Sequence, residues 1–177
     1  MALASSPAQA QFVATIFIDP CGVEMPLFTS TTIKVWVCAE GPIADGLTTA
    51  ELRIQGLPSG WLKTVRPNPA AAVVDGDLFG DGVRIVFPAC QPGVGQYLEL
   101  FAVDILPTDI QTDVLLAVAA TNPPSDPNFP CPFVTKCDAT FSKFCVNGFG
   151  AWINPREHGC PLAVENRTWG QVKSLYD

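Results

Sequence analysis

The sequence predicts an all-β protein, an antiparallel β-sandwich with a cysteine-rich C-terminal quarter and a short C-terminal helix. Stretches of alternating apolar and polar residues recur along the chain, and glycine and proline separate them. The 14 glycines and 17 prolines among 177 residues interrupt long helices and supply turns. A hydrophobic fraction of 48% is enough for a buried core. A β-barrel is the alternative architecture, because the strand pattern does not distinguish the two.

About eight strands are predicted, because alternation with a period of two places every second side chain on the same face of a sheet. In chain order they are 12–18, 32–37, 51–55, 83–87, 97–105, 113–120, 141–146 and 151–153. The last two are expected to form a hairpin around Asn147-Gly148, which is a favoured turn pair. The segment 121–130 contains four prolines and is expected to be a fixed, exposed loop.

Both ends of the chain are expected to lie outside a sandwich domain of residues 11–165. Residues 1–10 end in Ala8-Gln9-Ala10, a small-x-small pattern that signal peptidase cleaves after, and are interpreted as a signal-peptide remnant or a disordered tail. Residues 166–177 are expected to contain a short helix, since Thr168-Trp169-Gly170-Gln171 matches a capping box. Its apolar stripe would either seal the core of the sandwich or serve as a docking tag for an export or surface-anchoring partner.

The seven cysteines predict disulfide bonds and an extracellular location. None forms a C-x-x-C pair, whereas structural zinc sites usually use such closely spaced cysteines. Disulfides persist in oxidising compartments, so the protein is expected to be secreted or at the cell surface. One possible pairing joins Cys38 to Cys90, Cys145 to Cys160 and Cys131 to Cys137, which leaves Cys21. The sequence does not fix the connectivity.

The charge of the chain argues against nucleic-acid binding, and its hydropathy argues against a membrane-spanning helix. Seventeen acidic and ten basic residues give a net charge of −7, and no cluster of Lys and Arg is present. Nucleic acid is therefore not expected, because phosphate contacts need a basic surface. The longest apolar run, 114–120, is far shorter than the ~20 residues of a membrane-spanning helix.

Metal binding has one weak candidate in the sequence. Asp75, Asp77 and Asp81 lie close together with Gly76 and Gly82, and carboxylates at alternate positions can surround calcium. The twelfth position of such a loop is Val86, where an EF-hand requires glutamate. A polar hairpin turn explains the segment as well. No cofactor is expected.

Catalysis receives little support. His158 is the only histidine, and no G-x-S-x-G motif accompanies it, so Ser-His-Asp chemistry is not expected. Asp104, Asp109 and Asp113 remain open as carboxylates of a glycoside hydrolase, which needs two of them in proximity. No catalytic residue is assigned.

Tryptophan supplies the candidate ligand-binding residues. Sugars stack on exposed aromatic rings, and Trp61, which follows Pro58-Ser59-Gly60, is the expected exposed platform. Trp36 is a second candidate. The alternative is that both rings are buried in the core, where most tryptophans lie.

Four sequence segments carry a family resemblance. They are Leu52-x-Ile54-x-Gly56-Leu57-Pro58-x-Gly60-Trp61, Pro67-Asn68-Pro69, Phe87-Pro88-x-Cys90-Gln91-Pro92-Gly93 and Thr168-Trp169-Gly170-x-Val172-Lys173-x-Leu175-Tyr176. With these, the chain resembles a group of uncharacterised secreted bacterial β-sandwich proteins that end in a T-W-G-x-V-K-x-L-Y motif. The group is similar in general appearance to cohesin-like and immunoglobulin-like sandwiches. This resemblance implies binding rather than catalysis.

These observations predict a secreted or cell-surface β-sandwich that is a non-catalytic binding or structural module. The expected partner is a protein or an extracellular polymer. The alternative is a carbohydrate-binding module or a glycoside hydrolase with a weak sequence signature.

Overall fold

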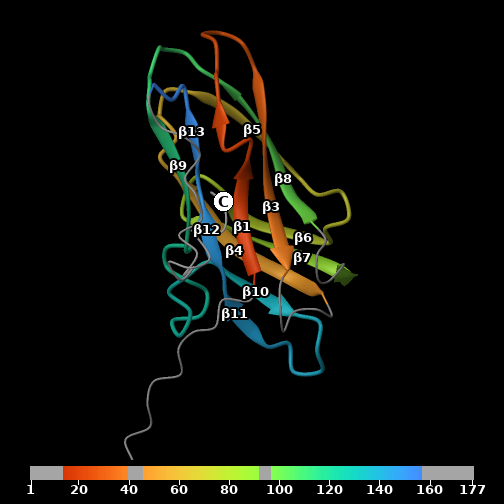
Figure 1. Ribbon diagram of the computed structural model, residues 1–177. Helices are drawn as coiled ribbons and strands as arrows, with labels where there is room; N and C mark the ends of the chain where they lie inside the picture. The colour runs from red at the N-terminus through yellow and green to blue at the C-terminus, as the bar shows by residue number, and fades with distance from the viewer. Residues whose placement is uncertain (1–13, 40–45, 92–96, 157–177) are drawn as a thin grey trace, which may run out of the picture.

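Two β-sheets packed face to face form the protein, as a computed structural model shows for residues 14–39, 46–91 and 97–156 (Figure 1). No helix is present in these ranges, so none is long and apolar enough to cross a membrane there. The predicted β-sandwich is confirmed. Residues 1–10, the expected C-terminal helix, His158 and Cys160 lie outside the described residues.

The first sheet has five strands. Their order is β12 (Asn147–Phe149), β1 (Ala14–Asp19), β3 (Thr31–Ala39), β8 (Tyr97–Leu106) and β5 (Leu62–Pro67). All neighbours are antiparallel except β12 and β1, which are parallel.

The second sheet has eight strands and branches at β4. Its main path is β11 (Lys143–Cys145), β10 (Phe133–Lys136), β4 (Leu47–Gln55), β9 (Val114–Ala119), β13 (Ala151–Ile153) and β2 (Gly22–Val23). The strand β7 (Gly82–Gln91) pairs with β4, and β6 (Val73–Asp77) pairs with β7.

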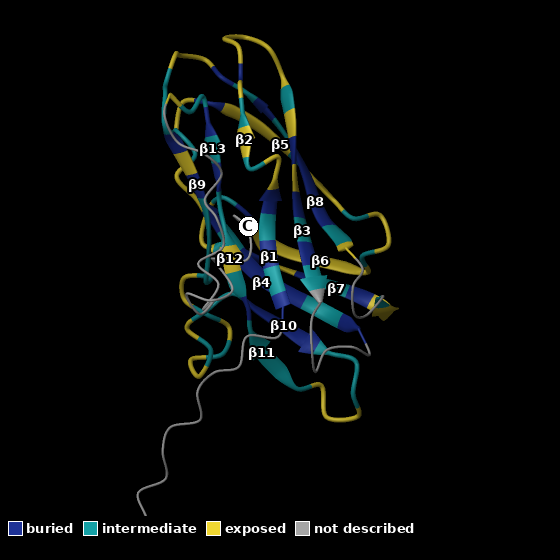
Figure 2. Ribbon diagram, viewed as in Figure 1, coloured by how far each residue is buried: buried dark blue, intermediate teal, exposed yellow. Residues whose placement is uncertain are grey.

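The core lies between the two sheets and contains the alternate residues that the sequence pattern predicts. Ile16 in β1, Val35 in β3 and Ile85 in β7 are fully buried, whereas their neighbours along each strand are more exposed (Figure 2). Each such side chain contributes roughly 1.5–3 kcal/mol through removal of apolar surface from water. The apolar alternation therefore determines which face of each strand is buried.

The predicted strands 12–18, 32–37, 51–55, 83–87, 97–105 and 113–120 correspond to β1, β3, β4, β7, β8 and β9. The predicted hairpin around Asn147-Gly148 is wrong. Both residues lie in β12, which pairs in parallel with β1, while β13 pairs with β9 and β2. A Cβ on Gly148 would lie 2.7 Å from the Val118 carbonyl oxygen, so glycine serves close packing here rather than a turn.

The disulfide pairing suggested from the sequence is also wrong. The structure contains Cys90–Cys137 and Cys131–Cys145, with Cα–Cα distances of 5.7 and 5.6 Å. Cys21 is also disulfide-bonded. Cys38 belongs to neither the Cys90–Cys137 nor the Cys131–Cys145 bridge.

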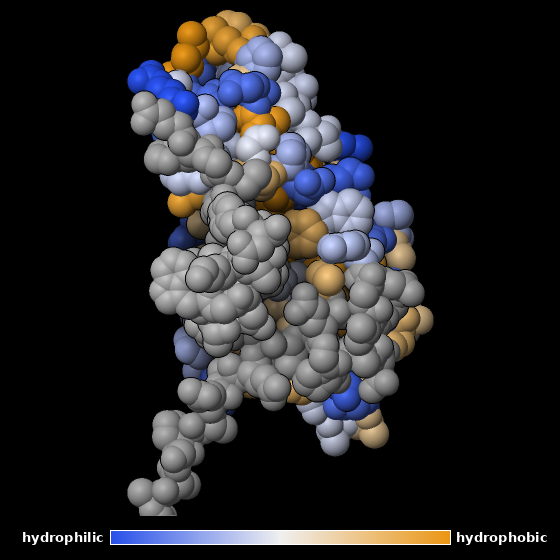
Figure 3. Space-filling model, in the orientation of Figure 1, coloured by the Kyte–Doolittle hydropathy of each residue, from blue (hydrophilic) through white to orange (hydrophobic). Residues whose placement is uncertain are grey.

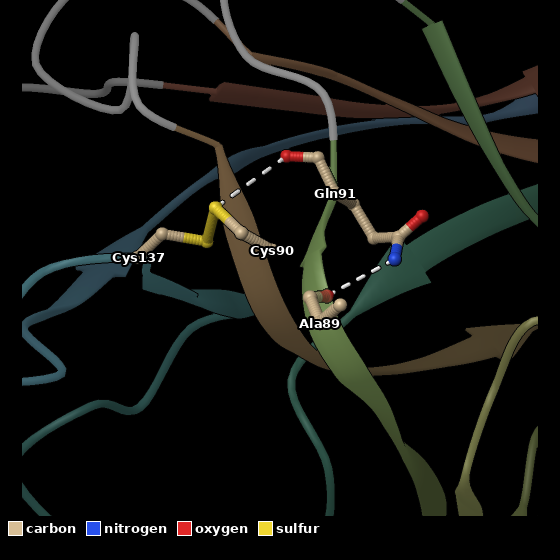
Figure 4. Close-up of a disulfide and its surroundings, with 4 residues drawn as sticks. All are labelled: Ala89, Cys90, Gln91 and Cys137. Carbon is tan, nitrogen blue, oxygen red and sulfur yellow. Dashed lines mark hydrogen bonds between the residues drawn. A yellow bond between two sulfur atoms is a disulfide. The ribbon is translucent and has the colours of Figure 1, made fainter.

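Strand pairing explains both bridges. Phe133 faces Cys145 across the β10–β11 pair, which brings Cys131 close to Cys145. The N–H of Cys137 donates to the carbonyl of Gly46, next to the end of β7 that carries Cys90. Figure 4 shows the Cys90–Cys137 bridge beside Gln91, whose side chain donates to the Ala89 carbonyl at 3.0 Å. The bridges therefore link residues that become neighbours only in the folded sheets.

Candidate functional site: an apolar tip

Four large apolar side chains are exposed on loops and a strand end at one end of the sandwich. Leu27 is 39% exposed, Phe28 69%, Leu62 60% and Ile110 78%. We call these four residues the apolar tip. Figure 3 shows apolar atoms gathered at the upper end of the molecule, where the β2–β3 and β8–β9 connections lie in Figure 1. Contiguous exposed apolar surface marks interaction sites in soluble proteins.

Backbone pairing brings the segments of the apolar tip together. The N–H of Phe28 donates to the carbonyl of Pro107 at 3.0 Å, which joins the β2–β3 connection to the end of β8. Leu62 faces Leu106 across the β5–β8 pair. Three segments that are distant in sequence therefore meet at this end.

Phe28 is held in an outward position by a tight turn. The N–H of Thr29 donates to the carbonyl of Pro26 at 3.1 Å, and Phe28 has φ 56°, in the left-handed region. This conformation costs roughly 1–2 kcal/mol for a residue with a Cβ. Strained residues of this kind cluster at ligand-binding sites. An exposed phenyl ring on a strained turn is thus a structural reason to place a binding contact at Phe28.

Trp61 supports the apolar tip from below. Its side chain is 3% exposed, and its Nε1–H donates to the carboxylate of Asp109. The hydroxyl of Thr108 donates to the Gly60 carbonyl at 2.9 Å. The prediction of Trp61 as an exposed platform is therefore wrong, because the ring packs into the core and fixes the loop that carries Ile110.

Asp109 remains ionised within this frame. Hydrogen bonds from Gln111, and next from Trp61, hold the pKa of Asp109 below its ordinary value. A carboxylate that accepts hydrogen bonds is stabilised in its charged form. The rim of the apolar tip thus carries a negative charge beside Ile110.

Asn154 closes the base of the apolar tip. Its Nδ2 donates to the Gln111 carbonyl at 2.8 Å, and its Oδ1 accepts from the N–H of Met25 at 2.7 Å. Asn154 has φ 50°, a conformation that asparagine tolerates better than most residues. The sequence does not single out this residue, and the only local signal is an asparagine directly after the short apolar segment Ala151–Ile153.

Trp36 lies on a different surface, the outer face of the five-stranded sheet. It is half-buried and faces Phe17 across the β1–β3 pair. Phe17 makes an edge-to-face contact with Tyr97 at 5.8 Å between ring centroids, and Tyr97 is 64% exposed. Lys34 lies 5.3 Å from the centroid of the Trp36 ring. We call Phe17, Trp36 and Tyr97 the aromatic face.

The three aspartates proposed for calcium do not form a group of three that could hold a metal ion. The described residues contain no group of three acidic, histidine or cysteine side chains that could hold a metal ion. Asp75 lies within β6, while Asp77 at its end accepts from the Phe79 N–H at 3.0 Å. Asp81 lies in the following turn, where its carbonyl accepts from the Asn122 N–H. The described residues therefore give the calcium interpretation no support, and the antiparallel pairing of β6 with β7 agrees with a hairpin turn.

A buried carboxylate attaches the proline-rich loop to the second sheet. Glu51 in β4 is 2% exposed, and it accepts from the Thr121 hydroxyl at 2.6 Å and from the Ser125 N–H at 3.0 Å. The Ser125 hydroxyl donates to its other oxygen. A pocket of about 280 Å³ lies between this loop and the β6–β7 turn. The loop is therefore fixed, as its prolines predict, but through a glutamate that the sequence pattern does not single out.

The carboxylates considered for glycoside hydrolysis have separate local partners. Hydrogen bonds from Thr32, and then from Arg66, lower the pKa of Asp104. The pKa of Asp109 is also lowered, and Asp113 accepts from the Arg156 N–H. A general acid in a glycosidase needs a raised pKa. Asp104 and Asp109 are therefore unsuited to proton donation.

Comparison with known proteins supports the fold. No protein-family model matches the sequence, and no curated protein matches it. Solved structures of cohesin modules do match its structure. One is the seventh ScaB type I cohesin from Pseudobacteroides cellulosolvens, with a TM-score of 0.56 and 6% identity over 89% of this chain and 100% of that one.

Two further matches have similar scores. The cohesin module of a family 33 glycoside hydrolase from Clostridium perfringens has a TM-score of 0.54 and 12% identity, over 82% of this chain and 99% of that one. The sixth cohesin of scaffoldin B from Acetivibrio cellulolyticus, solved in complex with the Cel5 dockerin, has a TM-score of 0.53 and 10% identity, over 81% and 99%. The chain therefore has a cohesin-like fold.

Proposed function

We propose that the protein is a non-catalytic binding module that works outside the cytoplasm and binds another protein through its apolar tip. The observation that carries this proposal is the exposed set of Leu27, Phe28, Leu62 and Ile110, whose segments are held by the buried Trp61 and by hydrogen bonds of Asn154. Apolar residues at the centre of an interface contribute most of its affinity when a polar rim excludes water.

The comparisons give this proposal a class of partner. Cohesin modules that match over nearly their whole length include one solved with a dockerin bound. A dockerin-like module of another extracellular protein is therefore the partner to test first. The disulfides Cys90–Cys137 and Cys131–Cys145 support an oxidising location.

The test is direct binding of the purified, oxidised chain to a panel of dockerin modules by calorimetry. We expect saturable binding of at least one dockerin with one site per chain. A matched panel of soluble and insoluble glycans is measured in parallel. Glycan binding without binding of any dockerin contradicts the proposal.

A carbohydrate-binding module is the second candidate function, and the aromatic face favours it. Tyr97 is exposed, and Trp36 and Phe17 lie beside it on a sheet surface that also carries Lys34 and Glu99. Sugars stack on such rings and form hydrogen bonds with the charged groups around them. Loss of glycan binding in Tyr97→Ala, with dockerin binding unchanged, would assign the aromatic face to sugar.

A further inference from the structure

The strand β6 (Val73–Asp77) has an edge without a partner strand among the described residues. It pairs with β7 on one side, and no described strand pairs with its other side. All five of its residues are exposed, as Figure 2 shows for the whole strand. An edge strand presents unpaired N–H and C=O groups that another extended chain can bind. We call this side of the strand the β6 edge.

The β6 edge has the acidic residues Asp75 and Asp77 in place of the basic residues and proline of the β5 edge. The edge strand β5 carries Lys63, Arg66 and Pro67, which oppose pairing with another strand. In contrast, β6 contains no lysine, arginine or proline, and Val73 and Val74 are 47% and 42% exposed. The two edges therefore differ in their capacity to accept a further strand.

The pairing of β4, β7 and β6 indicates which charge a further strand at the β6 edge should carry opposite Asp75. Glu51 in β4 faces Arg84 in β7, and Arg84 faces Asp75 in β6. The row is thus negative, positive and negative, and it ends at the β6 edge with an aspartate. Asp75 makes no ion pair within 4 Å with Arg84 or with any other described residue. A basic side chain at the next position outward would continue the alternation, since opposite charges on adjacent strands stabilise a sheet.

The neighbouring row lies on the other face of the sheet and is apolar. Ala50 in β4 faces Ile85 in β7, and Ile85 faces Val74 in β6. Ala50 and Ile85 are fully buried, whereas Val74 ends the row with an exposed side chain. An apolar residue at the next position outward would cover Val74. Because Val74 and Asp75 are consecutive, the two requirements fall on consecutive residues of the added strand.

We propose that the β6 edge binds an extended segment of a partner protein in which apolar residues alternate with lysine or arginine. Main-chain hydrogen bonds supply the affinity, and the contacts with Val74 and Asp75 supply the selectivity. A second copy of this chain fits less well, because pairing of two β6 strands brings Asp75 and Asp77 of both copies together. This site is distinct from the apolar tip and does not depend on the proposed function.

A short synthetic peptide of alternating valine and lysine tests the proposal, with the glutamate version of the same peptide as its control. Fluorescence anisotropy measures the affinity, and hydrogen exchange locates the site. We expect the lysine peptide to bind and to slow exchange of amides in 73–77. The charge reversal Asp75→Lys is expected to weaken binding about tenfold, and Asp75→Asn about threefold.

Matched variants separate the β6 edge from other causes. Thr64→Lys changes the charge of the exposed strand β5 by +1, as Asp75→Asn does in β6, and is expected to leave peptide binding unchanged. Because Asp75 is exposed, its variants are expected to fold, and thermal unfolding checks this. Equal affinity for the glutamate peptide, or slowed exchange outside 73–77, overturns the proposal. Sedimentation of the unmodified chain gives a further test. A dimer that Val74→Lys dissociates would assign the β6 edge to a second copy and would also overturn the proposal.

Discussion

The two ends of the sandwich are stabilised in different ways. At the apolar tip, loops are joined by hydrogen bonds around Trp61, Asp109 and Asn154. At the opposite end, where Figure 1 shows β10 and β11, two disulfides join the strands and their connections. The first end has exposed apolar residues on loops that the buried Trp61 ring and partly exposed hydrogen bonds hold in place. The second has two short strands, of which β10 is mostly buried and β11 is only partly buried, together with the two covalent links.

This difference shows that the two ends obtain their stability from different sources. Short strands such as β11, whose three residues are all only partly buried, gain little from burial, so a disulfide supplies stability there. The loops at the apolar tip have an anchor in the core, the buried ring of Trp61, which helps to present Phe28 and Ile110. We therefore expect loss of a disulfide at the second end to lower stability without weakening binding at the apolar tip.

The largest loss of stability is expected for Trp61→Ala. Removal of this buried ring leaves a cavity beneath the apolar tip and should lower the free energy of unfolding by about 3–5 kcal/mol. Trp61→Phe keeps much of the volume and loses the hydrogen bond to Asp109, which should cost about 1–2 kcal/mol. Urea unfolding measures both values. Equal stability of Trp61→Ala and the unmodified chain would contradict the role of Trp61 as an anchor.

Loss of the Cys90–Cys137 bridge is expected to rank next. The bridge spans 47 residues, so the double variant Cys90→Ser/Cys137→Ser should lower the free energy of unfolding by about 3–4 kcal/mol. The Cys131–Cys145 bridge spans 14 residues and should contribute about 3 kcal/mol or less. Urea unfolding of the two double variants tests this order. Partner binding at the apolar tip should persist in both variants below their unfolding transitions.

The loop of residues 121–130 resembles the apolar tip in its attachment, because hydrogen bonds hold it. Their acceptor is the buried carboxylate of Glu51. Glu51→Ala leaves the donors of Thr121 and Ser125 without their acceptor and should cost about 1–3 kcal/mol. Limited proteolysis should then cleave within 121–130 before the rest of the chain. Thr64→Ala, on the exposed strand β5, is the control and should change neither property. Unchanged protection of the loop in Glu51→Ala would show that its prolines alone fix it.

The sequence predicts the central strands well and the peripheral ones poorly. Strands such as β1 and β3 alternate between core and solvent, so their pattern reflects one buried face. The strands β5 and β6 are mostly exposed and show no such pattern, and both were missed. Asn147-Gly148 has a strong local turn preference that pairing with β1 overrides. Local signals fail where long-range contacts decide the conformation.

The candidate site was predictable only in part. The position of Trp61 after a Pro-Ser-Gly turn indicates a ring near a loop, but it does not distinguish an exposed platform from a buried anchor. The exposed residues Phe28 and Ile110 belong to no motif, and only the folded loops bring them together. The disulfide pairs failed for the same reason, because strand register rather than sequence spacing determines which cysteines meet.

The smallest expected effect is a loss of local stability at low pH in the turn that contains Asp138, next to Cys137. Hydrogen bonds from the Ser142 N–H, and also from Thr140, lower the pKa of Asp138 from 3.8 to about 2. A carboxyl whose folded pKa is depressed stabilises the fold above its unfolded pKa, and this contribution is lost as the pH falls toward 2. Amide exchange at Thr140 and Ser142 should therefore rise between pH 4 and pH 2 relative to the intrinsic rate. Asp138→Asn should remove this dependence, and a carboxyl titration of Asp138 near 4 by NMR would contradict it.

The most direct test of the central claim compares partner binding by two variants that each replace an exposed aromatic residue with aspartate. Phe28→Asp alters the apolar tip, and Tyr97→Asp alters the aromatic face, where the exposed fraction is similar. For a dockerin that binds the unmodified chain, Phe28→Asp should weaken the affinity by about thirtyfold or more, as expected for a central contact. Tyr97→Asp should leave it unchanged. Loss of binding in Tyr97→Asp with full affinity in Phe28→Asp would contradict the assignment of the apolar tip as the partner site.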